Sequence, residues 1–138
     1  MPTLNVNPKD MFAAMREIPP NYPVFMVNLL RFREHADYGD RQGMAPCSGR
    51  EAYHRGYIPA FRQLAPPGVE LFFLGPVLAA LAQPSEERWD EVMIVKYANF
   101  ATFQKIVLAP RYNELVNFHR LAALEDWRLI ATSKVAEP

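Results

Sequence analysis

The sequence predicts one α+β domain with the ferredoxin-like βαββαβ order of strands and helices. The chain has 138 residues, close to the commonest size of a single domain. Four short apolar runs are separated by two helical stretches in the order of a split βαβ unit. Two of these runs are apolar on both faces, which predicts a sheet that is covered on both sides. We therefore expect an antiparallel sheet in a single domain over residues 1–138, with a helical extension at 1–22 and a tail at 133–138.

The N-terminal extension carries the signals of a short helix. Asn7 is a suitable N-cap, Pro8 suits the first helical position, and Asp10 lies where the helix dipole favours a negative charge. Pro19 and Pro20 end the pattern. One short helix is too small to cover a whole sheet face.

Four segments have the alternation or the apolar character of strands: residues 23–32, 69–77, 90–97 and 127–132. The first reads PVFMVNLLRF and the third reads DEVMIVKY, and both present apolar side chains in each direction. Two crossover helices lie on the same face of such a sheet, because the connections are right-handed. The other face then needs a second copy of the chain, so we expect a homodimer through the sheet face.

Both crossover segments begin with a capping residue and contain a proline. Ser48 and Glu51 form a capping box, and Asn99 is a suitable N-cap for the second segment. Pro59 is expected to kink or divide the first helix, and Pro110 interrupts the second. The long polar loop over residues 33–46 is expected to be mobile or to cover the mouth of a pocket.

The composition excludes several classes of function. Fifteen Lys and Arg balance fifteen Asp and Glu, so we expect no nucleic-acid partner. Cys47 is the single cysteine, so neither an internal disulfide nor a thiolate zinc cluster is possible. No signal peptide and no apolar run of about 20 residues is visible, and we expect a cytoplasmic protein without a membrane partner. No phosphate-binding, dinucleotide-binding or metalloprotease motif is present, and we expect no cofactor and no metal.

Several motifs resemble a known bacterial family, domain of unknown function 1330. They are VNLLRF at 27–32, SGREAY at 48–53, WDEVMIVKY at 89–97, and PRY followed by HRLAALED within 110–126. The resemblance runs from the first strand to the last and implies the dimeric α/β-barrel superfamily. That superfamily includes cofactor-free oxygenases, muconolactone isomerase and haem-binding proteins, so it does not select a reaction.

Asn28, Tyr53 and Tyr57 are candidate substrate-binding residues. Asn28 interrupts an apolar strand face, and its amide either points into a pocket or pins a neighbouring element. Tyr53 and Tyr57 share one helix face and either contact a ligand or belong to the core. His54 is a candidate general base, with a solvated histidine as the alternative.

Arg120 and His119 are the candidates in the second helical segment. The planar fork of Arg120 suits a carboxylate of a substrate, and an ion pair with Glu125, Asp126 or an acid of a partner chain is the alternative. His119 is a second candidate for proton transfer, and a core histidine is the alternative.

Three functions are compatible with these residues. The first is a cofactor-independent enzyme of isomerase or oxygenase type that acts on a small, partly apolar molecule between sheet and helices. The second is a protein that binds a metabolite in the same pocket without catalysis. The third is a haem-binding protein with His119 as the axial ligand.

Overall fold

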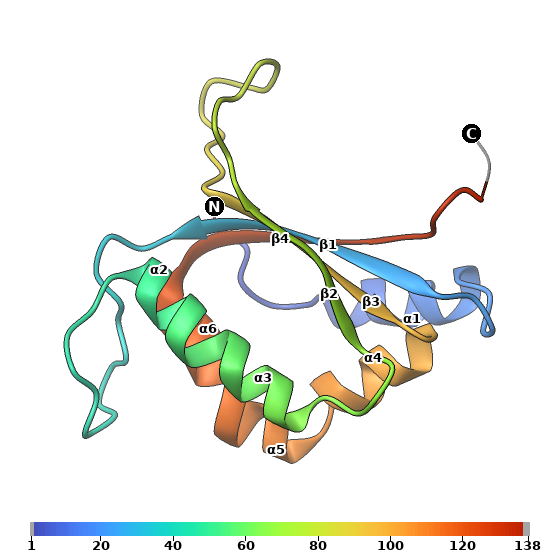
Figure 1. The fold of residues 1–138 in the computed structure, drawn as a ribbon, viewed down its shortest axis with the longest axis horizontal. Coiled ribbons are helices and arrows are strands. Elements are labelled where there is room, and N and C mark those ends of the chain that lie inside the picture. The colour runs from blue at the N-terminus through green and yellow to red at the C-terminus, as the bar shows by residue number, and fades with distance from the viewer. Residues whose placement is uncertain (1, 137–138) are drawn as a thin grey trace.

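The structure, a computed structural model, describes residues 2–136 and has the predicted ferredoxin-like architecture. The four strands are β1 (Val24–Phe32), β2 (Glu70–Pro76), β3 (Glu91–Tyr97) and β4 (Leu124–Thr132). They form one antiparallel sheet in the order β2-β3-β1-β4. Both crossover segments lie on the same side of this sheet (Figure 1). The predicted α+β fold with an N-terminal helix is therefore confirmed.

The helix α1 (Pro8–Glu17) begins as the sequence predicts. The side chain of Asn7 accepts a hydrogen bond from the backbone N–H of Lys9, and Pro8 occupies the first turn. Met11 and Ala14 pack against the core, while Phe12 on the same helix is exposed. The helix therefore closes one end of the domain and does not cover a sheet face.

The first crossover consists of α2 (Gly49–Glu51), the π-helix η1 (Ala52–Tyr57) and α3 (Ile58–Leu64). The capping box is confirmed, because Ser48 and Glu51 exchange hydrogen bonds between side chain and backbone. Pro59 lacks a backbone N–H, and its ring would clash with the carbonyl four residues earlier in an α-helix. The wider π turn immediately before Pro59 accommodates both effects, and the helix continues.

The second crossover is divided in the same way. It consists of α4 (Phe100–Val107), α5 (Pro110–Tyr112), η2 (Asn113–Asn117) and α6 (Phe118–Ala123). The side chain of Asn99 caps α4 by accepting a hydrogen bond from the N–H of Thr102. The interruption at Pro110 is confirmed as the start of α5. Strand β4 follows α6 directly and begins at Leu124, three residues before the sequence pattern indicates.

The sheet has two different faces. The inner face packs on the helices and carries Met26 and Leu30 of β1 and Met93 of β3, which are buried. The outer face carries the alternate side chains, and a bulge in β2 turns both Phe72 and Phe73 toward it. Within residues 2–136 no helix covers the outer face, and the hairpin between β2 and β3 rises from that side (Figure 1).

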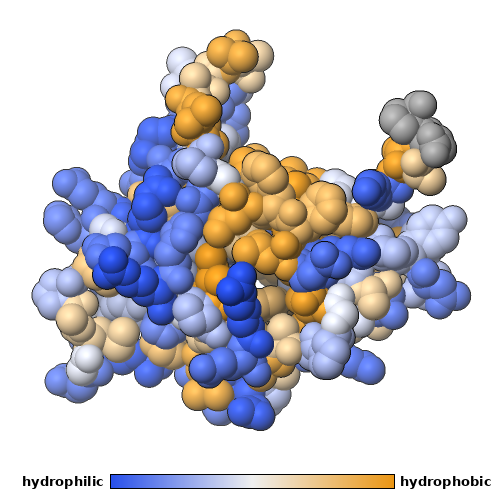
Figure 2. Space-filling model, in the orientation of Figure 1, coloured by the Kyte–Doolittle hydropathy of each residue, from blue (hydrophilic) through white to orange (hydrophobic). Residues whose placement is uncertain are grey.

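The outer face is an apolar surface. Its members are hydrophobic side chains from all four strands: Phe25, Val27, Leu29, Phe72, Phe73, Val92, Ile94 and Ile130. Figure 2 shows apolar residues gathered below the β2–β3 hairpin, with polar residues over the first crossover. The hairpin itself presents Leu78 and Leu81, which are 94% and 96% exposed.

The loop between β1 and α2 lies against the second crossover. The backbone N–H of Asp37 donates to the carbonyl of Ala122 at 2.9 Å, and that of Ala36 donates to the carbonyl of Cys47 at 2.9 Å. The hydroxyl of Tyr38 is hydrogen-bonded to Nδ1 of His119 at 2.7 Å. The loop is therefore anchored beside α6, where the sequence predicted a mobile segment or a cover over a pocket.

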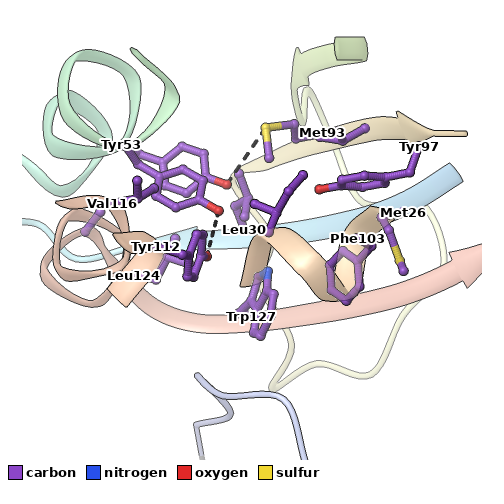
Figure 3. Close-up of a cluster of buried hydrophobic side chains, with 14 of the residues drawn as sticks. Met26, Leu30, Tyr53, Met93, Tyr97, Phe103, Tyr112, Val116, Leu124 and Trp127 are labelled. Carbon is purple, nitrogen blue, oxygen red and sulfur yellow. Dashed lines mark hydrogen bonds between the residues drawn. The ribbon is translucent and has the colours of Figure 1, made fainter. Parts of the chain in front are cut away.

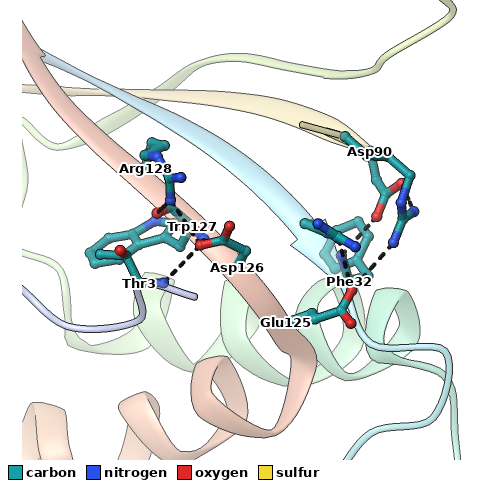
Figure 4. A network of polar contacts seen from close by, with 9 residues as sticks. Thr3, Phe32, Asp90, Glu125, Asp126, Trp127 and Arg128 are labelled. Carbon is teal, nitrogen blue, oxygen red and sulfur yellow. Dashed lines mark hydrogen bonds and ion pairs between the residues drawn. The ribbon is translucent and has the colours of Figure 1, made fainter. Parts of the chain in front are cut away.

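Polar contacts fasten both the N-terminal segment and the end of β1 (Figure 4). The N–H of Thr3 donates to the carboxylate of Asp126 at 2.8 Å, and Arg128 donates to the same oxygen at 2.8 Å. The N–H of Phe32 donates to the carboxylate of Asp90 at 2.8 Å. The bond from Thr3 to Asp126 holds the segment before α1 across β4, at one end of the cavity described next. The bond from Phe32 to Asp90 fastens the end of β1.

None of the helices formed by residues 2–136 combines the length and the apolar character that crossing a membrane requires.

Candidate ligand-binding cavity

A cavity of about 340 Å³ lies between the inner face of the sheet and the helices. Every strand contributes to its wall, as do α3, α4 and the second crossover. The segment around Asn5 and Val6 reaches it from the N-terminal side, together with Met11 of α1. The split βαβ fold thus leaves space where the two crossovers diverge from the sheet.

Most of the cavity wall is apolar. Figure 3 shows how side chains of the sheet and the helices face one another around this part of the core. The hydrophobic and aromatic residues that line the cavity include Met26, Ile58, Phe61, Val69, Leu71, Met93, Val95, Phe103, Val107, Leu108, Trp127 and Leu129. A wall of this kind favours an apolar ligand, because apolar surface gains free energy when it leaves water.

Asn28 lies in the middle of this wall, and the protein uses most of its hydrogen-bonding capacity. Its Nδ2 donates to the carbonyls of Met26 and Met93, both at 3.3 Å. Its Oδ1 accepts from the indole N–H of Trp127 at 3.0 Å. The amide thus joins β1, β3 and β4, and it fixes the ring of Trp127 against the cavity.

Tyr57 and Tyr112 form a pair of hydroxyl groups in the cavity wall. Their oxygens are 2.9 Å apart, and both side chains are buried. One hydroxyl donates to the other, so the second O–H of the pair has its hydrogen free. Burial raises the pKa of Tyr57 well above its usual value, so its hydroxyl stays neutral near pH 7.

Arg120 is a buried cation in the wall. Arg120 is only 5% exposed, and its Nε donates a hydrogen bond to Oδ1 of Asn117 at 2.8 Å. The guanidinium lies over the ring of Trp127, 4.3 Å from the centroid. Its Nη1 is buried without a hydrogen-bond partner among the described residues. Glu125 and Asp126 instead pair with Arg31, Arg88 and Arg128, so neither of the ion pairs considered for Arg120 within this chain is formed.

Tyr53 belongs to the core and is absent from the cavity wall. It is fully buried, stacks on Tyr57 with ring centroids 4.9 Å apart, and its hydroxyl lies 3.8 Å from Sδ of Met93. Desolvation raises its pKa well above the usual value. The i, i+4 relation predicted for the two tyrosines is thus present, but only Tyr57 reaches the cavity.

His54 lies outside the cavity wall, in a partly exposed cluster around the buried carboxylate of Glu91. Its Nε2 is 2.6 Å from Oε1 of Glu91, and Nη1 of Arg50 donates to the other carboxylate oxygen at 2.8 Å. Glu91 is almost completely buried at the start of β3. The cluster fastens α2 and η1 to the sheet.

His119 is also separate from the cavity wall. Its ring contacts Tyr38 and lies so close to the backbone of Gly56 that a Cβ there would be 2.4 Å from Nδ1. Burial lowers the pKa of His119, and the positive charge of Arg41 lowers it further. The structure therefore brings Asn28, Tyr57 and Arg120 together, and distributes the two histidines over two other places.

Sequence reasoning missed Tyr112 and Asn117, which complete the polar side of the cavity. Asn117 carries a detectable signal, since it is a polar residue among the apolar positions of an amphipathic segment. Tyr112 looks like any core aromatic in the sequence, and only the fold brings its hydroxyl to Tyr57.

Within residues 2–136, His, Cys, Asp and Glu side chains form no group of three or more that could hold a metal ion.

Two crystal structures of the RPA0582 protein are similar to this chain over nearly its whole length. Methylated RPA0582 is 32% identical, with a TM-score of 0.77, and the match covers 99% of this chain and 97% of that one. The second, from Rhodopseudomonas palustris, is 33% identical with a TM-score of 0.75 and covers 98% of each chain. The chain belongs to the RPA0582 family. RPA0582 is described as a protein of unknown function, so this kinship establishes the fold and leaves the ligand open.

No family model matches the chain. No curated protein matches it either. Membership of the family called domain of unknown function 1330 therefore stays a prediction.

Proposed function

We propose that this member of the RPA0582 family binds a small, largely apolar molecule in the cavity between sheet and helices. The observation that carries this proposal is a cavity of about 340 Å³ with an apolar wall and a few polar groups on one side. Ligand sites of proteins commonly combine a predominantly apolar lining with a few well-placed polar groups, in volumes of roughly 300–1,000 Å³. The space is therefore suited to a compact metabolite.

Binding is favoured over catalysis by the positions of the histidines. A general base has to lie within hydrogen-bond reach of the proton that it removes. His54 and His119 lie outside the cavity wall and are engaged with Glu91 and Tyr38. An isomerase-type or oxygenase-type activity, and haem binding at His119, remain predictions from the sequence that the cavity does not support.

Binding is measurable through Trp127, whose ring lines the cavity. The chain has two tryptophans, so a Trp89→Phe background leaves Trp127 as the reporter. We expect its fluorescence to change when compact aromatic probes, naphthalene-2-carboxylate and naphthalene-2-carboxamide, are titrated into the protein. At least one of the two should bind with a Kd below about 1 mM, and failure of both would refute the proposal.

A variant that fills the cavity provides the second test. Val95→Phe on β3 adds a ring to the wall and should abolish the response to both probes. Ala101→Phe on the exposed side of α4 adds the same ring outside the cavity and serves as the matched control. Equal probe binding by the two folded variants would mean that the probes bind elsewhere.

We also propose that two copies of the chain pair through the outer face of the sheet, as in the dimeric α/β-barrel superfamily. This is supported by the apolar residues on all four strands of that face and by the exposed leucines Leu78 and Leu81 beside it. Monomers rarely leave so large a continuous apolar area in water. The zero net charge adds no strong repulsion between copies. The same fold, together with the motifs quoted above, supports placing the chain in the domain of unknown function 1330 family.

Sedimentation equilibrium at micromolar concentration tests the pairing. We expect a dimer for the unchanged chain and a monomer for Phe73→Asp, which puts a charge among the apolar residues of the outer face, on the edge strand β2. Leu115→Asp, at an exposed apolar position on the helical side, should remain dimeric. A monomeric unchanged chain would refute the proposal.

A further inference from the structure

We propose that the ligand of the cavity is a small carboxylic acid whose carboxylate pairs with Arg120, while its apolar body lies against the rest of the wall. This proposal rests on the proposed function, since it specifies the chemical class of the molecule in the same cavity. It adds one requirement that binding of an apolar molecule alone does not have, a negative charge.

The first argument is the charge of the cavity wall. Arg120 and Arg62 are its two cationic residues, and no Asp or Glu is among the described residues that line it. Burying a cation away from water costs free energy unless an anion or several hydrogen bonds compensate it. The protein supplies one hydrogen bond to the guanidinium, from Nε to Asn117. An anion from outside would complete the compensation.

The second argument is the way in which the guanidinium is held. Asn117 fixes Nε at 2.8 Å, and the ring of Trp127 supports the flat face at 4.3 Å. Trp127 is itself fixed by its hydrogen bond to Asn28. The plane of the fork is therefore set before a ligand arrives, and Nη1 has no hydrogen-bond partner within residues 2–136. A planar carboxylate matches such a fork better than a spherical anion does.

The third argument is a second hydrogen-bond donor in the same wall. The pair formed by Tyr57 and Tyr112 has one hydroxyl hydrogen that neither oxygen accepts. Tyr57, Tyr112 and Arg120 all line the same cavity. A carboxylate has two oxygens, and the site offers a cationic donor and a neutral one.

The remaining wall determines the body of the acid. The other side chains of the wall include Val69, Leu71 and Val107, which offer neither a hydrogen bond nor a charge. A hydroxylated or doubly charged body would leave polar groups without partners there, which is costly. We therefore infer an aromatic or branched aliphatic monocarboxylic acid.

Matched pairs of probes test the charge directly. Calorimetric titration of the Trp89→Phe protein with naphthalene-2-carboxylate and with its amide compares two molecules of nearly equal shape. We expect the acid to bind about 10- to 100-fold more tightly, the range of a hydrogen bond to a charged group. In Arg120→Met, this preference should disappear, because affinity for the acid falls and affinity for the amide does not.

The same variant separates a ligand-binding role from a structural one. If Arg120 serves a ligand, Arg120→Met in the absence of ligand should unfold at the same or a higher urea concentration, since it removes an uncompensated buried charge. Arg111→Met, which removes an exposed cation of the second crossover that does not line the cavity, is the matched control and should keep the preference for the acid. Arg120→Lys keeps the charge without the fork and should retain only part of it.

The outcomes distinguish this proposal from the one on which it rests. If the acid and the amide bind equally and Val95→Phe abolishes binding of both, the cavity binds small molecules but the proposed carboxylate group of the ligand is wrong. If neither binds, the proposed function fails as well. Tighter binding of naphthalene-2-phosphonate than of the carboxylate would also overturn the assignment of a monoanion.

Discussion

Glu91 offers a sharp test of how the helices are held to the sheet. The Glu91 side chain is only 3% exposed, and its carboxylate accepts hydrogen bonds from Arg50 at 2.8 Å and from His54 at 2.6 Å. Glu91→Gln keeps the shape and removes the charge. Hydrogen bonds to charged groups contribute about 1.5–3 kcal/mol each when buried. The Arg50 and His54 side chains are 49% and 35% exposed, so water partly replaces the lost bonds.

We therefore expect Glu91→Gln to lower the free energy of unfolding by about 2–3 kcal/mol, measured by urea denaturation at pH 7. Glu125→Gln is the matched control, because that carboxylate also contacts two basic side chains, Arg31 and Arg88, but is 44% exposed. It should cost less than about 1 kcal/mol. Equal losses for the two variants would show that burial does not strengthen the Glu91 cluster. If the Glu91 cluster acts as described, removing Arg50 in addition to Glu91→Gln should lower the free energy of unfolding little further than Glu91→Gln alone.

Three further changes have expected outcomes of their own. Asn28→Leu leaves the indole N–H of Trp127 without its acceptor and should lower the free energy of unfolding by about 1–3 kcal/mol in urea, and a loss confined to ligand binding would contradict the structural role. NMR titration should give His119 a pKa below 6.5. The contribution of neutral His119 to stability is then complete above pH 6.5 and declines as the pH falls. An unshifted titration, or stability that rises on acidification, would contradict the burial of His119 beside Tyr38. Gly49→Ala puts a Cβ 2.3 Å from a backbone oxygen of the loop after β1, so it should lower the thermal midpoint of unfolding. A midpoint within about 1 °C of that of the unchanged chain would show that this contact relaxes freely.

The fold was predictable because its signals are local. Alternating apolar residues, the capping residues Ser48 and Asn99, and the helix start at Asn7 each depend on a few neighbouring positions, and the structure confirms them. The start of β4 was placed three residues late. Leu124 follows α6 without a turn residue, and the strand begins there because it pairs with Phe32 of β1, which is a long-range contact.

The cavity was predictable only in part. Asn28 and Arg120 could be identified from the sequence, because a polar residue on an otherwise apolar face requires a hydrogen-bonding or ion-pairing partner. Their actual partners, Trp127 for Asn28 and Asn117 for Arg120, depend on how strands and helices meet in space. The histidines were judged by their chemistry alone, and nothing local reveals that Glu91 lies 37 positions from His54 yet directly against it.

The two π turns have a consequence for comparing members of the family. Each contains one residue more than the α-helical turn that it replaces, and each ends on a cavity residue, Tyr57 in η1 and Asn117 in η2. A relative that lacks one residue within 52–57 or 113–117 would keep the helix and the fold. Only the turn itself would change: its last residue, Tyr57 or Asn117, would no longer be held in the same position, while the side chains beyond the turn would keep their orientation. A single gap at these positions in an alignment would therefore mark a homologue with a different specificity, even where the overall identity is high.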